Sequence, residues 1–584
     1  MNNKILAFIW LLILTLSSLS SNSQVARPSD WDEIIQQNWY RGVVYGKVAF
    51  VYLDPLHQDA GYFFIADKSL PDIYELKIKK KKQDRMAIQF RMGGKKIRAE
   101  FKGTVNDDTI SGTIKTRRGT SRRLVIPVKL PVALVLEKPV IHAPPPPRYQ
   151  SPVFNQVGIL ENISFGAASG YYTSMPVVGE SEYDYQQIIL DALKKMFVHP
   201  GKDAFLNILN KDLISLAITD LQSLRLDLYQ PVGDTLKKRP LVVLMHGGAF
   251  IIGDKACPTN QELAHYFAAK GYVVASINYR LGFNPASKNS LERSAYRAVQ
   301  DARAALRYLS YNAETYRIDP DCIFLGGSSA GAITALNTVF MKEDERLEST
   351  ESNIWLLQKD LGGLDESTNN YRNSYTIKAV ANLWGAVHDT NLIDREEHVP
   401  VVSFHGDADK IVPCDCNYPF TDLDTLWTRN IICKMYGSRF IHRRLTNLGI
   451  NSELVILPGA GHEPQYEEGK YAMVMDTIAV RMTGFYNRAM FGFPEIAGPT
   501  QVKAKAPLPI YSLPDQKDVR YYWQVNGGKI LPGNIKSQVR VVWLAEKTGT
   551  IELLMVHKNQ ANLEVNLPVT LPHNEANYFP VRKR

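Results

Sequence analysis

Residues 322–336 read CIFLGGSSAGAITAL, an apolar run, a cluster of glycines and serines, and a second apolar run. The first run, Cys322 to Leu325, has the length and composition of a buried strand, and the second run has those of a helix. Glycine and alanine at the junction allow a tight turn, because little or no side chain obstructs the backbone. We therefore expect Ser329, the centre of Gly-x-Ser-x-Gly, to sit in strained backbone geometry with its hydroxyl above a sheet edge.

The sequence around this turn alternates between continuous apolar runs and helical stretches. The apolar runs are typical of parallel strands that are covered on both faces; they are 241–245, 273–278, 322–325, 377–384, 401–405 and 454–457. Helical candidates between them include 261–270 and 294–311. This alternation predicts a doubly wound, mostly parallel α/β domain over residues 151–494.

The segments on either side of this domain have a different pattern. Residues 31–135 contain short alternating segments separated by turn pairs, which predicts an antiparallel β-domain, a sandwich or a barrel. A proline-rich linker, 136–150, follows, and residues 507–584 return to short β segments that predict a small sandwich. The expected fold is an α/β domain flanked by two all-β domains.

The amino terminus has the layout of a secretory signal. Lys4 precedes the uncharged apolar stretch Ile5 to Leu16, and small polar residues continue to Ser23. Such a stretch is too short to span a bilayer, so we expect a cleaved leader at 1–23 rather than an anchor. No later stretch reads as a membrane span, and the expected location is periplasmic or extracellular.

Charge and cysteine content bear on several classes of protein. The formal net charge is +9, and its densest run, 77–82, lies in strand-like sequence without a stacking-aromatic module, which favours a solvated sheet face over nucleic-acid binding. Five cysteines permit one or two disulfides in an exported protein, and the favoured pair joins Cys433 to Cys414 or Cys416. The last two form C-x-C without a second pair at zinc spacing, so we expect neither a metal nor another cofactor.

A serine nucleophile needs a base, and the base needs a carboxylate. His462 stands in PGAGHEP after the last apolar run, and HGDADKIVP at 405–413 supplies Asp407 and Asp409. Asp409 lies further into its loop and is the expected acid, whereas Asp407 is expected to serve the turn. A loop histidine and turn aspartates also have ordinary structural explanations. The order Ser329, Asp409, His462, each after a separate strand, favours a catalytic triad.

A tetrahedral intermediate also requires hydrogen-bond donors for its oxyanion. The segment His246-Gly-Gly-Ala249 follows the run 241–245, and its small residues leave the approach to the backbone open. We expect the N–H groups of Gly248, Ala249 and Ala330 to be these donors. A plain turn built on two glycines is the alternative.

These segments together resemble the α/β-hydrolase superfamily, and in particular its carboxylesterases of the hormone-sensitive-lipase-like and type-B kinds. The resemblance covers most of the α/β domain and includes GYVVASINYRLGF at 271–283, DARAALRYL at 301–309 and YRIDPDCIFLGGSSAG at 316–331. It implies that Ser329 is the nucleophile. It further implies these roles for the other residues: Asp409 the acid, His462 the base, and Gly248, Ala249 and Ala330 the oxyanion hole.

The sequence departs from those esterases at Ala249, where they have a third glycine, and the added methyl is expected to narrow the acyl or alcohol side of the pocket. The carboxy-terminal YYWQVNGG and VRVVWL are similar to immunoglobulin-like PKD-type modules of secreted bacterial proteins. Residues 31–135 suggest no family. The long insertion 340–375 is either a lid or pocket wall, or a passive excursion.

We therefore expect a secreted serine esterase that acts through an acyl-enzyme on a small-molecule or polysaccharide-linked ester. We expect neither a nucleic-acid partner nor an integral membrane span, and the sequence does not indicate an oligomeric state. A serine peptidase is the first alternative, and the His-Gly-Gly loop and the lack of a propeller-like repeat domain disfavour it. A non-catalytic adhesion protein is the second, and the retention of Ser329, Asp409 and His462 disfavours it.

Overall fold

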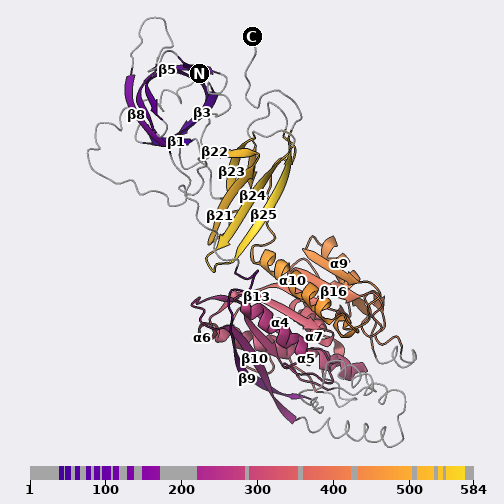
Figure 1. Ribbon diagram of the computed structural model, residues 1–584. Helices are drawn as coiled ribbons and strands as arrows, with labels where there is room; N and C mark the ends of the chain where they lie inside the picture. Colours follow the sequence, from indigo (N-terminus) through magenta and orange to yellow (C-terminus); the bar gives the residue numbers. More distant parts are fainter. Residues whose placement is uncertain are drawn as a thin grey trace, which may run out of the picture. The chain divides into compact units, whose positions relative to one another are not determined.

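Eight strands form the central sheet of the computed structural model. In sheet order they are β19 (Ser452–Leu457), β16 (Val401–Gly406), β14 (Ile377–Leu383), β13 (Ile318–Ser328), β11 (Arg239–Met245), β12 (Val273–Ile277), β10 (Asp220–Pro231) and β9 (Val157–Gly170). Neighbours from β19 to β12 are parallel, whereas β10 is antiparallel to both β12 and β9. Figure 1 shows β9 and β10 at one side of this sheet and β16 toward the other.

The structure describes part of the chain with side chains. These residues are 148–170, 220–282, 288–352, 359–422, 432–502, 509–531, 537–543 and 548–571, with a few side chains left out inside them, and the backbone of eight strands is described between residues 39 and 136. The predicted leader, 1–23, and most of the predicted linker, 136–150, lie outside the described residues.

The strands follow the apolar runs of the sequence. β11 and β12 are buried at every residue, as expected for strands with helices on both faces. The predicted mostly parallel α/β sheet is confirmed, and it fits the α/β-hydrolase fold. β13 begins at Ile318, before the predicted start at Cys322, because Ile318 pairs with Arg239 at the start of β11.

Helices cover both faces of the sheet. They are α4 (Pro258–Ala269), α5 (Lys288–Tyr311), α6 (Ala313–Tyr316), α7 (Ala330–Phe340), α9 (Ser438–Asn447) and α10 (Tyr471–Met490). Short 3₁₀ turns lie between them, η2 (Glu343–Glu345), η3 (Glu348–Thr350), η4 (Thr390–Leu392) and η5 (Pro464–Tyr466). A small three-stranded sheet consists of β15 (Ala386–Val387), β18 (Met435–Gly437) and β17 (Cys416–Asn417). None of the described helices has the length and apolar character needed to cross a membrane.

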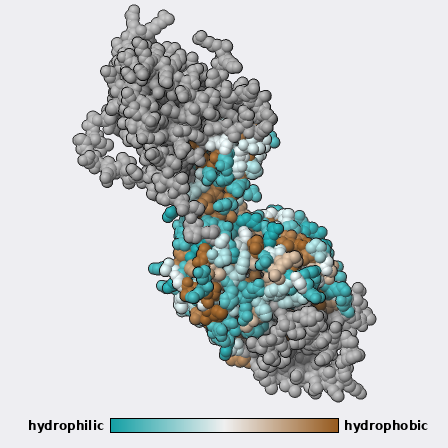
Figure 2. Space-filling model, viewed as in Figure 1, coloured by the Kyte–Doolittle hydropathy of each residue, from teal (hydrophilic) through white to brown (hydrophobic). Residues whose placement is uncertain are grey.

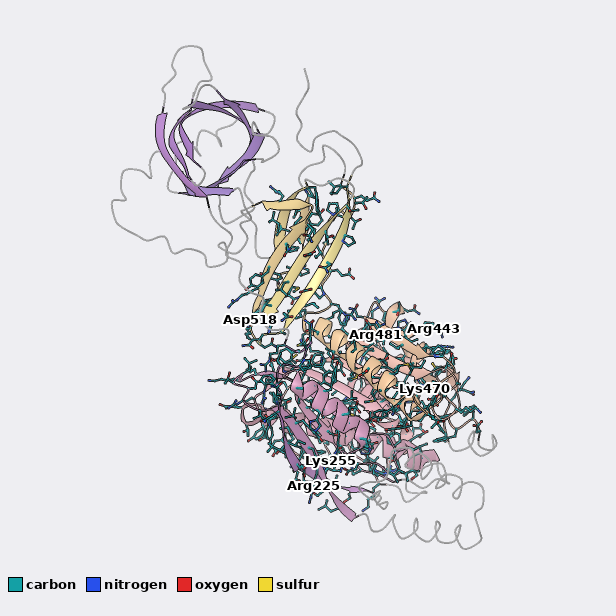
Figure 3. All side chains as sticks on the ribbon, viewed as in Figure 1. Arg225, Lys255, Arg443, Lys470, Arg481 and Asp518 are labelled. Atoms are coloured by element: carbon teal, nitrogen blue, oxygen red, sulfur yellow. The ribbon has the colours of Figure 1, made fainter. Side chains whose placement is uncertain are left out.

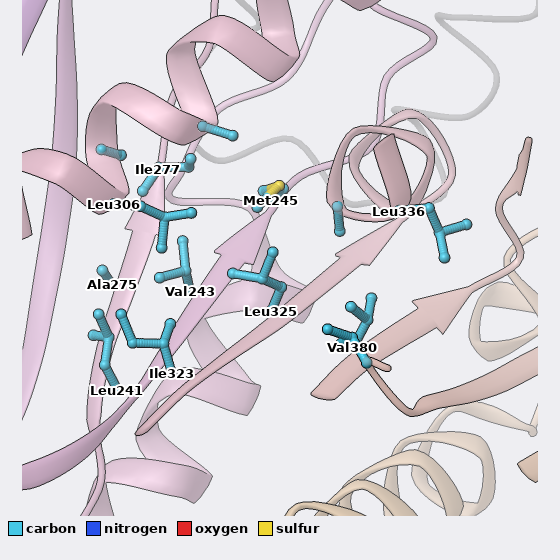
Figure 4. Packing of buried hydrophobic residues seen from close by; sticks show 14 of the residues in the cluster. Leu241, Val243, Met245, Ala275, Ile277, Leu306, Ile323, Leu325, Leu336 and Val380 are labelled. Carbon is cyan, nitrogen blue, oxygen red and sulfur yellow. The ribbon is translucent and has the colours of Figure 1, made fainter. Parts of the chain in front are cut away.

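Alternation along β13 sends its side chains to two different cores. Leu325 packs with Leu306 of α5 and Leu336 of α7 in a cluster to which α9 also contributes (Figure 4). Phe324 faces the other way and stacks on Tyr486 of α10 at 4.4 Å between ring centroids. Leu325 is fully buried, so its truncation to alanine would cost about 2–5 kcal/mol of stability.

The second described part of the long insertion, 359–375, lies along α5. Arginines of α5 donate hydrogen bonds to the backbone of this segment. Arg293 donates to the carbonyl of Lys359 at 2.7 Å, and Arg307 donates to the carbonyl of Ser367 at 3.0 Å. Gln300 donates to the carbonyl of Leu361 at 2.8 Å. These contacts favour the passive excursion for this part of the insertion.

Charged side chains are distributed over several elements of the α/β unit, and Figure 3 labels Arg443, Lys470 and Arg481 among them. Some charged side chains form buried ion pairs. Lys255, for example, is buried and pairs with Asp227 at 2.8 Å. On the face shown in Figure 2, hydrophilic and hydrophobic residues are interspersed over this unit. Lys77 to Lys80 lie in a strand whose side chains are outside the described ones, so the solvated lysine face remains a prediction.

The chain divides into two compact units, of which the α/β unit comprises residues 145–493 and 559–562. The other unit contains a closed barrel of β1 (Trp39–Val44), β2 (Lys47–Leu53), β3 (Ala60–Ile65), β4 (Tyr74–Lys80), β5 (Arg85–Met92), β6 (Lys95–Asn106), β7 (Thr109–Thr116) and β8 (Val128–Leu136).

The second unit also contains two small antiparallel sheets near the carboxyl terminus. One is β20 (Ile510–Ser512), β23 (Gln538–Trp543) and β22 (Gly528–Leu531), and the other is β21 (Val519–Asn526), β24 (Thr548–His557) and β25 (Asn562–Thr570). Trp543 of the first sheet packs on Gly549 of the second, where a Cβ would lie 2.2 Å from the indole ring. The buried indole donates a hydrogen bond to the hydroxyl of Tyr511 at 3.2 Å.

The five cysteines, all in the described part of the chain, form no disulfide, so the expected pairing of Cys433 with Cys414 or Cys416 is wrong. Cys433 packs against an apolar cluster that contains Phe250 and Ile333. Cys414 lies buried just before β17, where its carbonyl accepts a hydrogen bond from the N–H of Arg439 at 3.1 Å. Burial raises the pKa of the Cys414 thiol to about 11, which disfavours the reactive thiolate.

Candidate active site

Ser329 occupies the single residue between β13 and α7. Its backbone has φ 53° and ψ −117°, a conformation that costs a non-glycine residue about 1–3 kcal/mol. Its N–H donates to the carbonyl of Leu383 at 2.9 Å, and its carbonyl accepts from Ile333 at 3.0 Å. These two bonds hold the strained turn between β14 and the first turn of α7.

The flanking glycines are required by close packing. A Cβ on Gly327 would lie 2.3 Å from the carbonyl oxygen of Gly331, and a Cβ on Gly331 would lie 2.2 Å from the carbonyl oxygen of Met245. Both distances are impossible for a side chain. The spacing Gly-x-Ser-x-Gly therefore arises because β13, α7 and the end of β11 meet at this turn.

The structure brings the three predicted triad residues together. His462 lies in the loop between β19 and η5, and its Nε2 is 2.9 Å from Oγ of Ser329. Its Nδ1 is 2.7 Å from Oδ2 of Asp409, in the loop after β16. A continuous hydrogen-bonded chain thus joins a hydroxyl, an imidazole and a carboxylate that are far apart in the sequence.

Hydrogen bonds between two loops fix the separation of Asp409 and His462. Ala408 N–H donates to the carbonyl of Ala460 at 3.0 Å, and Gly459 N–H donates to Oδ1 of Asp407 at 2.6 Å. Asp407 therefore lies outside the hydrogen-bonded chain of Ser329, His462 and Asp409, and it connects the loop of Asp409 to the loop of His462.

The side chain of Asp409 is completely buried and fully hydrogen-bonded. Oδ1 accepts the N–H groups of Ile411 and Val412 at 2.8 and 2.9 Å. Oδ2 lies beside His462 and is also 3.3 Å from Nε2 of His405. Burial alone would raise the pKa of Asp409, but the charge of His462 and the hydrogen bonds from both histidines outweigh it and hold the pKa well below its usual range.

The pKa of His462 shifts in the opposite direction to that of Asp409. Burial lowers the pKa of His462, but the charge of Asp409 and the hydrogen bond to it outweigh burial, so the net pKa is raised above 6.5. The carboxylate therefore favours the protonated form of His462. It also keeps the proton of the neutral ring on Nδ1 and leaves Nε2 facing Ser329.

The expected oxyanion loop follows β11 and has an unusual backbone. Positive φ angles occur at Gly248, Ala249 and Phe250, with values of 110°, 51° and 60°. The carbonyl of Gly248 accepts hydrogen bonds from Ile251 and Ile252, which closes the loop. None of the backbone–backbone hydrogen bonds that the described residues form uses the N–H of Gly248, Ala249 or Ala330. Their role as oxyanion donors stays a prediction.

The side chain of His246 contacts this loop and holds it in place. Its Nδ1 donates to the carbonyl of Gly247 at 2.7 Å, and its ring stacks on Tyr279 at 4.4 Å between centroids. The Tyr279 hydroxyl donates to the carbonyl of His246 at 2.7 Å. Burial lowers the pKa of His246 to about 4, so the ring is neutral near pH 7. Tyr279 was missed as a site residue, although it lies within GYVVASINYRLGF.

An apolar cavity of about 100 Å³ is lined in part by a residue that follows the expected oxyanion loop and by residues of α7. Phe250 follows the oxyanion loop and Ile333 lies one turn beyond Ser329, and both contribute to the cavity and to one hydrophobic cluster with Ala330. Its lining is completed by Leu291, Glu292, Ala295, Tyr296, Val299, Thr334, Asn337, Met341, Leu347, His388, Ile432, Cys433 and Met435. Met341 and Leu347 belong to the start of the insertion 340–375, so this part forms pocket wall.

One group of acidic side chains has the spacing of metal ligands. Oxygens of Asp394, Glu396 and Glu397 lie within 4.8 Å of one another. Lys342 already pairs with this group and lies 2.8 Å from Glu396 and 3.5 Å from Glu397. The ammonium of Lys342 thus compensates part of the negative charge of this group.

Comparison with known proteins relates this geometry to esterases. A family model described as BD-FAE matches residues 226–421, which include Ser329 and Asp409. Isoprenylcysteine alpha-carbonyl methylesterase ICME of Arabidopsis thaliana is 28% identical over 235 residues, 36% of this chain and 51% of that protein. Carboxylesterase 3B of Mus musculus is 34% identical over 112 residues, 19% of each protein.

Among solved structures, Thermogutta terrifontis esterase 2 phosphorylated by paraoxon is 20% identical with a TM-score of 0.33, over 47% of this chain and 90% of that chain. The matches span about half the length or less of the curated relatives. The family model, the related sequences and the topology of the sheet together support an α/β-hydrolase of the esterase kind.

Proposed function

We propose that the α/β unit hydrolyses carboxylic esters through an acyl-enzyme on Ser329. The observation that carries the proposal is the pair of contacts made by His462, 2.9 Å to Ser329 and 2.7 Å to Asp409. This is the arrangement in which an imidazole accepts a hydroxyl proton while a carboxylate stabilises the resulting charge.

The reaction has two halves. In the first, Oγ of Ser329 bonds to the ester carbonyl carbon while its proton passes to Nε2 of His462. The intermediate collapses, the bond to the alcohol oxygen breaks, and His462 returns the proton to the leaving alcohol. In the second half, His462 takes a proton from water, the hydroxide attacks the acyl carbon, and the acid leaves as Ser329 regains its proton.

The negative oxygen of each intermediate would accept the N–H groups of Gly248, Ala249 and Ala330. The loss of one such donor typically costs about 3 kcal/mol of transition-state stabilisation. Ala330 also begins α7, so the positive end of this helix dipole lies at the reacting centre.

The cavity next to Phe250 and Ile333 would receive one part of the ester. Its mostly apolar lining favours a compact hydrophobic group, and the methyl of Ala249 narrows the approach from the oxyanion loop. The proposed substrates are small-molecule or polysaccharide-linked esters, with the remaining part of the molecule extending to solvent.

Hydrolysis of short-chain p-nitrophenyl esters, compared with a panel of peptide amides, tests the reaction class. The folded Ser329→Ala variant should lose ester hydrolysis, by on the order of 10⁶-fold in kcat for a working triad. Activity that persists in that variant would remove Ser329 as the nucleophile. Cleavage of amides alone would make the protein a peptidase.

We further propose that residues 1–23 are a cleaved leader and that the protein is exported. The layout of Lys4 followed by the apolar stretch Ile5 to Leu16 supports this. We also propose that residues 31–135 and 507–584 are separate all-β domains, the second a PKD or immunoglobulin-like module. Amino-terminal sequencing of the mature protein from the periplasm or medium tests export, and limited proteolysis tests the domain boundaries.

A further inference from the structure

His405 lies at the end of β16 and is completely buried. Both of its ring nitrogens have partners. Nδ1 is 2.7 Å from Oγ of Ser438, and Nε2 is 2.9 Å from the carbonyl of Val412. The same Nε2 is 3.3 Å from Oδ2 of Asp409, the oxygen that His462 also contacts. Asp409 is therefore in contact with two histidines, of which one faces Ser329 and the other does not.

The partners of His405 decide which nitrogen carries its hydrogen. The Val412 carbonyl and the Asp409 carboxylate are acceptors only, so Nε2 must be the donor. Ser438 Oγ accepts a hydrogen bond from Nδ2 of Asn382 at 3.0 Å, which leaves the serine hydrogen to donate to Nδ1 of His405. The Nε2–H donor of His405 is thus aimed at Val412 and Asp409.

This donor acts on Asp409 along two routes. The direct route is the 3.3 Å contact with Oδ2. The second route passes through Val412, whose carbonyl accepts from His405 while its N–H donates to Oδ1 of Asp409 at 2.9 Å. Both oxygens of the carboxylate are therefore restrained by groups that His405 contacts, and its orientation toward His462 depends on them.

Few charged side chains lie near the ring of His405 within the described part of the chain. Asp409 comes from its own loop, and His462, from the loop after β19, acts on it through Asp409. Arg439 follows Ser438 on α9, but its guanidinium pairs with Asp415 at 3.0 Å and lies 3.9 Å from Asp407, near solvent. The titration that His405 influences is thus that of the Asp409–His462 pair.

We propose that His405 is a positioning residue for the proposed hydrolysis: its Nε2–H keeps the carboxylate of Asp409 aimed at Nδ1 of His462. The proposal rests on the assignment of Ser329, Asp409 and His462 given above. It adds His405, whose ring lies between Ser438 and Val412, as the support of the acid.

The test compares His405→Leu, which removes the donor, with His405→Gln, whose amide can donate to Val412 and accept from Ser438. For p-nitrophenyl butyrate, His405→Leu should lower kcat about 10- to 100-fold and leave KM within about twofold. The acidic limb of the profile of kcat/KM against pH should move to lower pH, because a misaligned carboxylate no longer raises the pKa of His462. His405→Gln should recover most of kcat and the position of the limb.

Ser438→Ala is the matched control, because it removes the partner of Nδ1 of His405 and leaves the Nε2–H donor in place. It should lose stability in thermal unfolding with a smaller loss of kcat than His405→Leu and no movement of the acidic limb. If His405→Leu does not fold, His405→Gln is compared with His405→Asn, whose shorter amide does not reach Asp409. An active Gln variant beside an impaired Asn variant supports the proposal, and equal activity overturns it.

A folded His405→Leu variant with wild-type kcat and an unmoved acidic limb overturns the role of His405. Ser329→Ala, measured in the same assay, separates this outcome from a failure of the proposed function. If Ser329→Ala retains activity, the triad assignment itself is wrong. If Ser329→Ala is inactive while His405→Leu keeps the wild-type kcat and pH profile, only the positioning role of His405 is wrong.

Discussion

Gly331 at the start of α7 lies against Met245 at the end of β11, so closely that a Cβ on the glycine would come within 2.2 Å of the methionine carbonyl oxygen. The replacement Gly331→Ala must therefore separate α7 from β11 and shift the turn that holds Ser329. We expect a loss of stability of several kcal/mol or an insoluble protein, and at least 10²-fold lower kcat in any folded fraction.

Gly484 of α10 is the matched control for that replacement, because nothing lies within 4 Å of a Cβ built on it. Gly484→Ala should leave activity unchanged and raise the free energy of unfolding by up to about 1 kcal/mol through helix propensity. Thermal unfolding and ester hydrolysis of both variants check the pair. A Gly331→Ala protein as stable and active as Gly484→Ala would contradict the close packing.

The dependence of activity on pH follows from the raised pKa of His462. The base must be neutral to accept the proton of Ser329, so kcat/KM should rise with pH and reach half its maximum above pH 6.5. In Asp409→Asn the charge that raises this pKa is absent, and the midpoint should move to lower pH while kcat falls on the order of 10³- to 10⁴-fold. A midpoint well below 6.5 in the wild-type enzyme would speak against the ion pair.

Ile333 faces the cavity one turn beyond Ser329, and a larger side chain there should reduce the space for the substrate. Ile333→Phe should lower kcat/KM for p-nitrophenyl hexanoate about 10-fold more than for the acetate, since a methylene in an apolar pocket is worth about 1–3 kcal/mol. Val480→Phe on the exposed face of α10 is the size-matched control and should change neither substrate. Equal losses for both esters with Ile333→Phe would remove the cavity from the substrate path.

Tyr279 supports the oxyanion loop through its hydroxyl, which donates to the carbonyl of His246. Tyr279→Phe keeps the ring stacked on His246 and removes that donor. The expected cost is about 1 kcal/mol of stability together with a severalfold loss of kcat at unchanged KM. Thermal unfolding and steady-state kinetics measure both quantities, and a lower kcat without any loss of stability would indicate a direct contact with substrate instead.

Much of the α/β sheet and the order of the candidate triad could be predicted because each depends on local pattern. Continuous apolar runs mark buried parallel strands, and a residue that follows such a strand reaches the same sheet edge as the others. Ser329, Asp409 and His462 each follow a strand, so their convergence was accessible without coordinates. The start of strand β13 could not be predicted, because the strand extends back to Ile318 through pairing with Arg239 rather than through its own apolar character.

The supporting residues could not be predicted, because their roles depend on partners that only the fold brings near. His405 stands in HGDADKIVP beside Asp409, but its Nδ1 contacts Ser438, in a different element. Tyr279 likewise contacts His246 only because β11 and β12 are neighbours. The disulfide prediction was wrong because the spacing of Cys433 and Cys414 carries no information on the apolar cluster that takes up Cys433.

The segment 359–375 is bound to α5 by two kinds of contact. Its main-chain oxygens accept hydrogen bonds from Arg293, Gln300 and Arg307, and its own Asp365 forms an ion pair with Arg303 at 3.0 Å. Positions of this segment whose side chains make no such contact can therefore diversify in sequence, or accept a grafted epitope, without loosening the segment from α5.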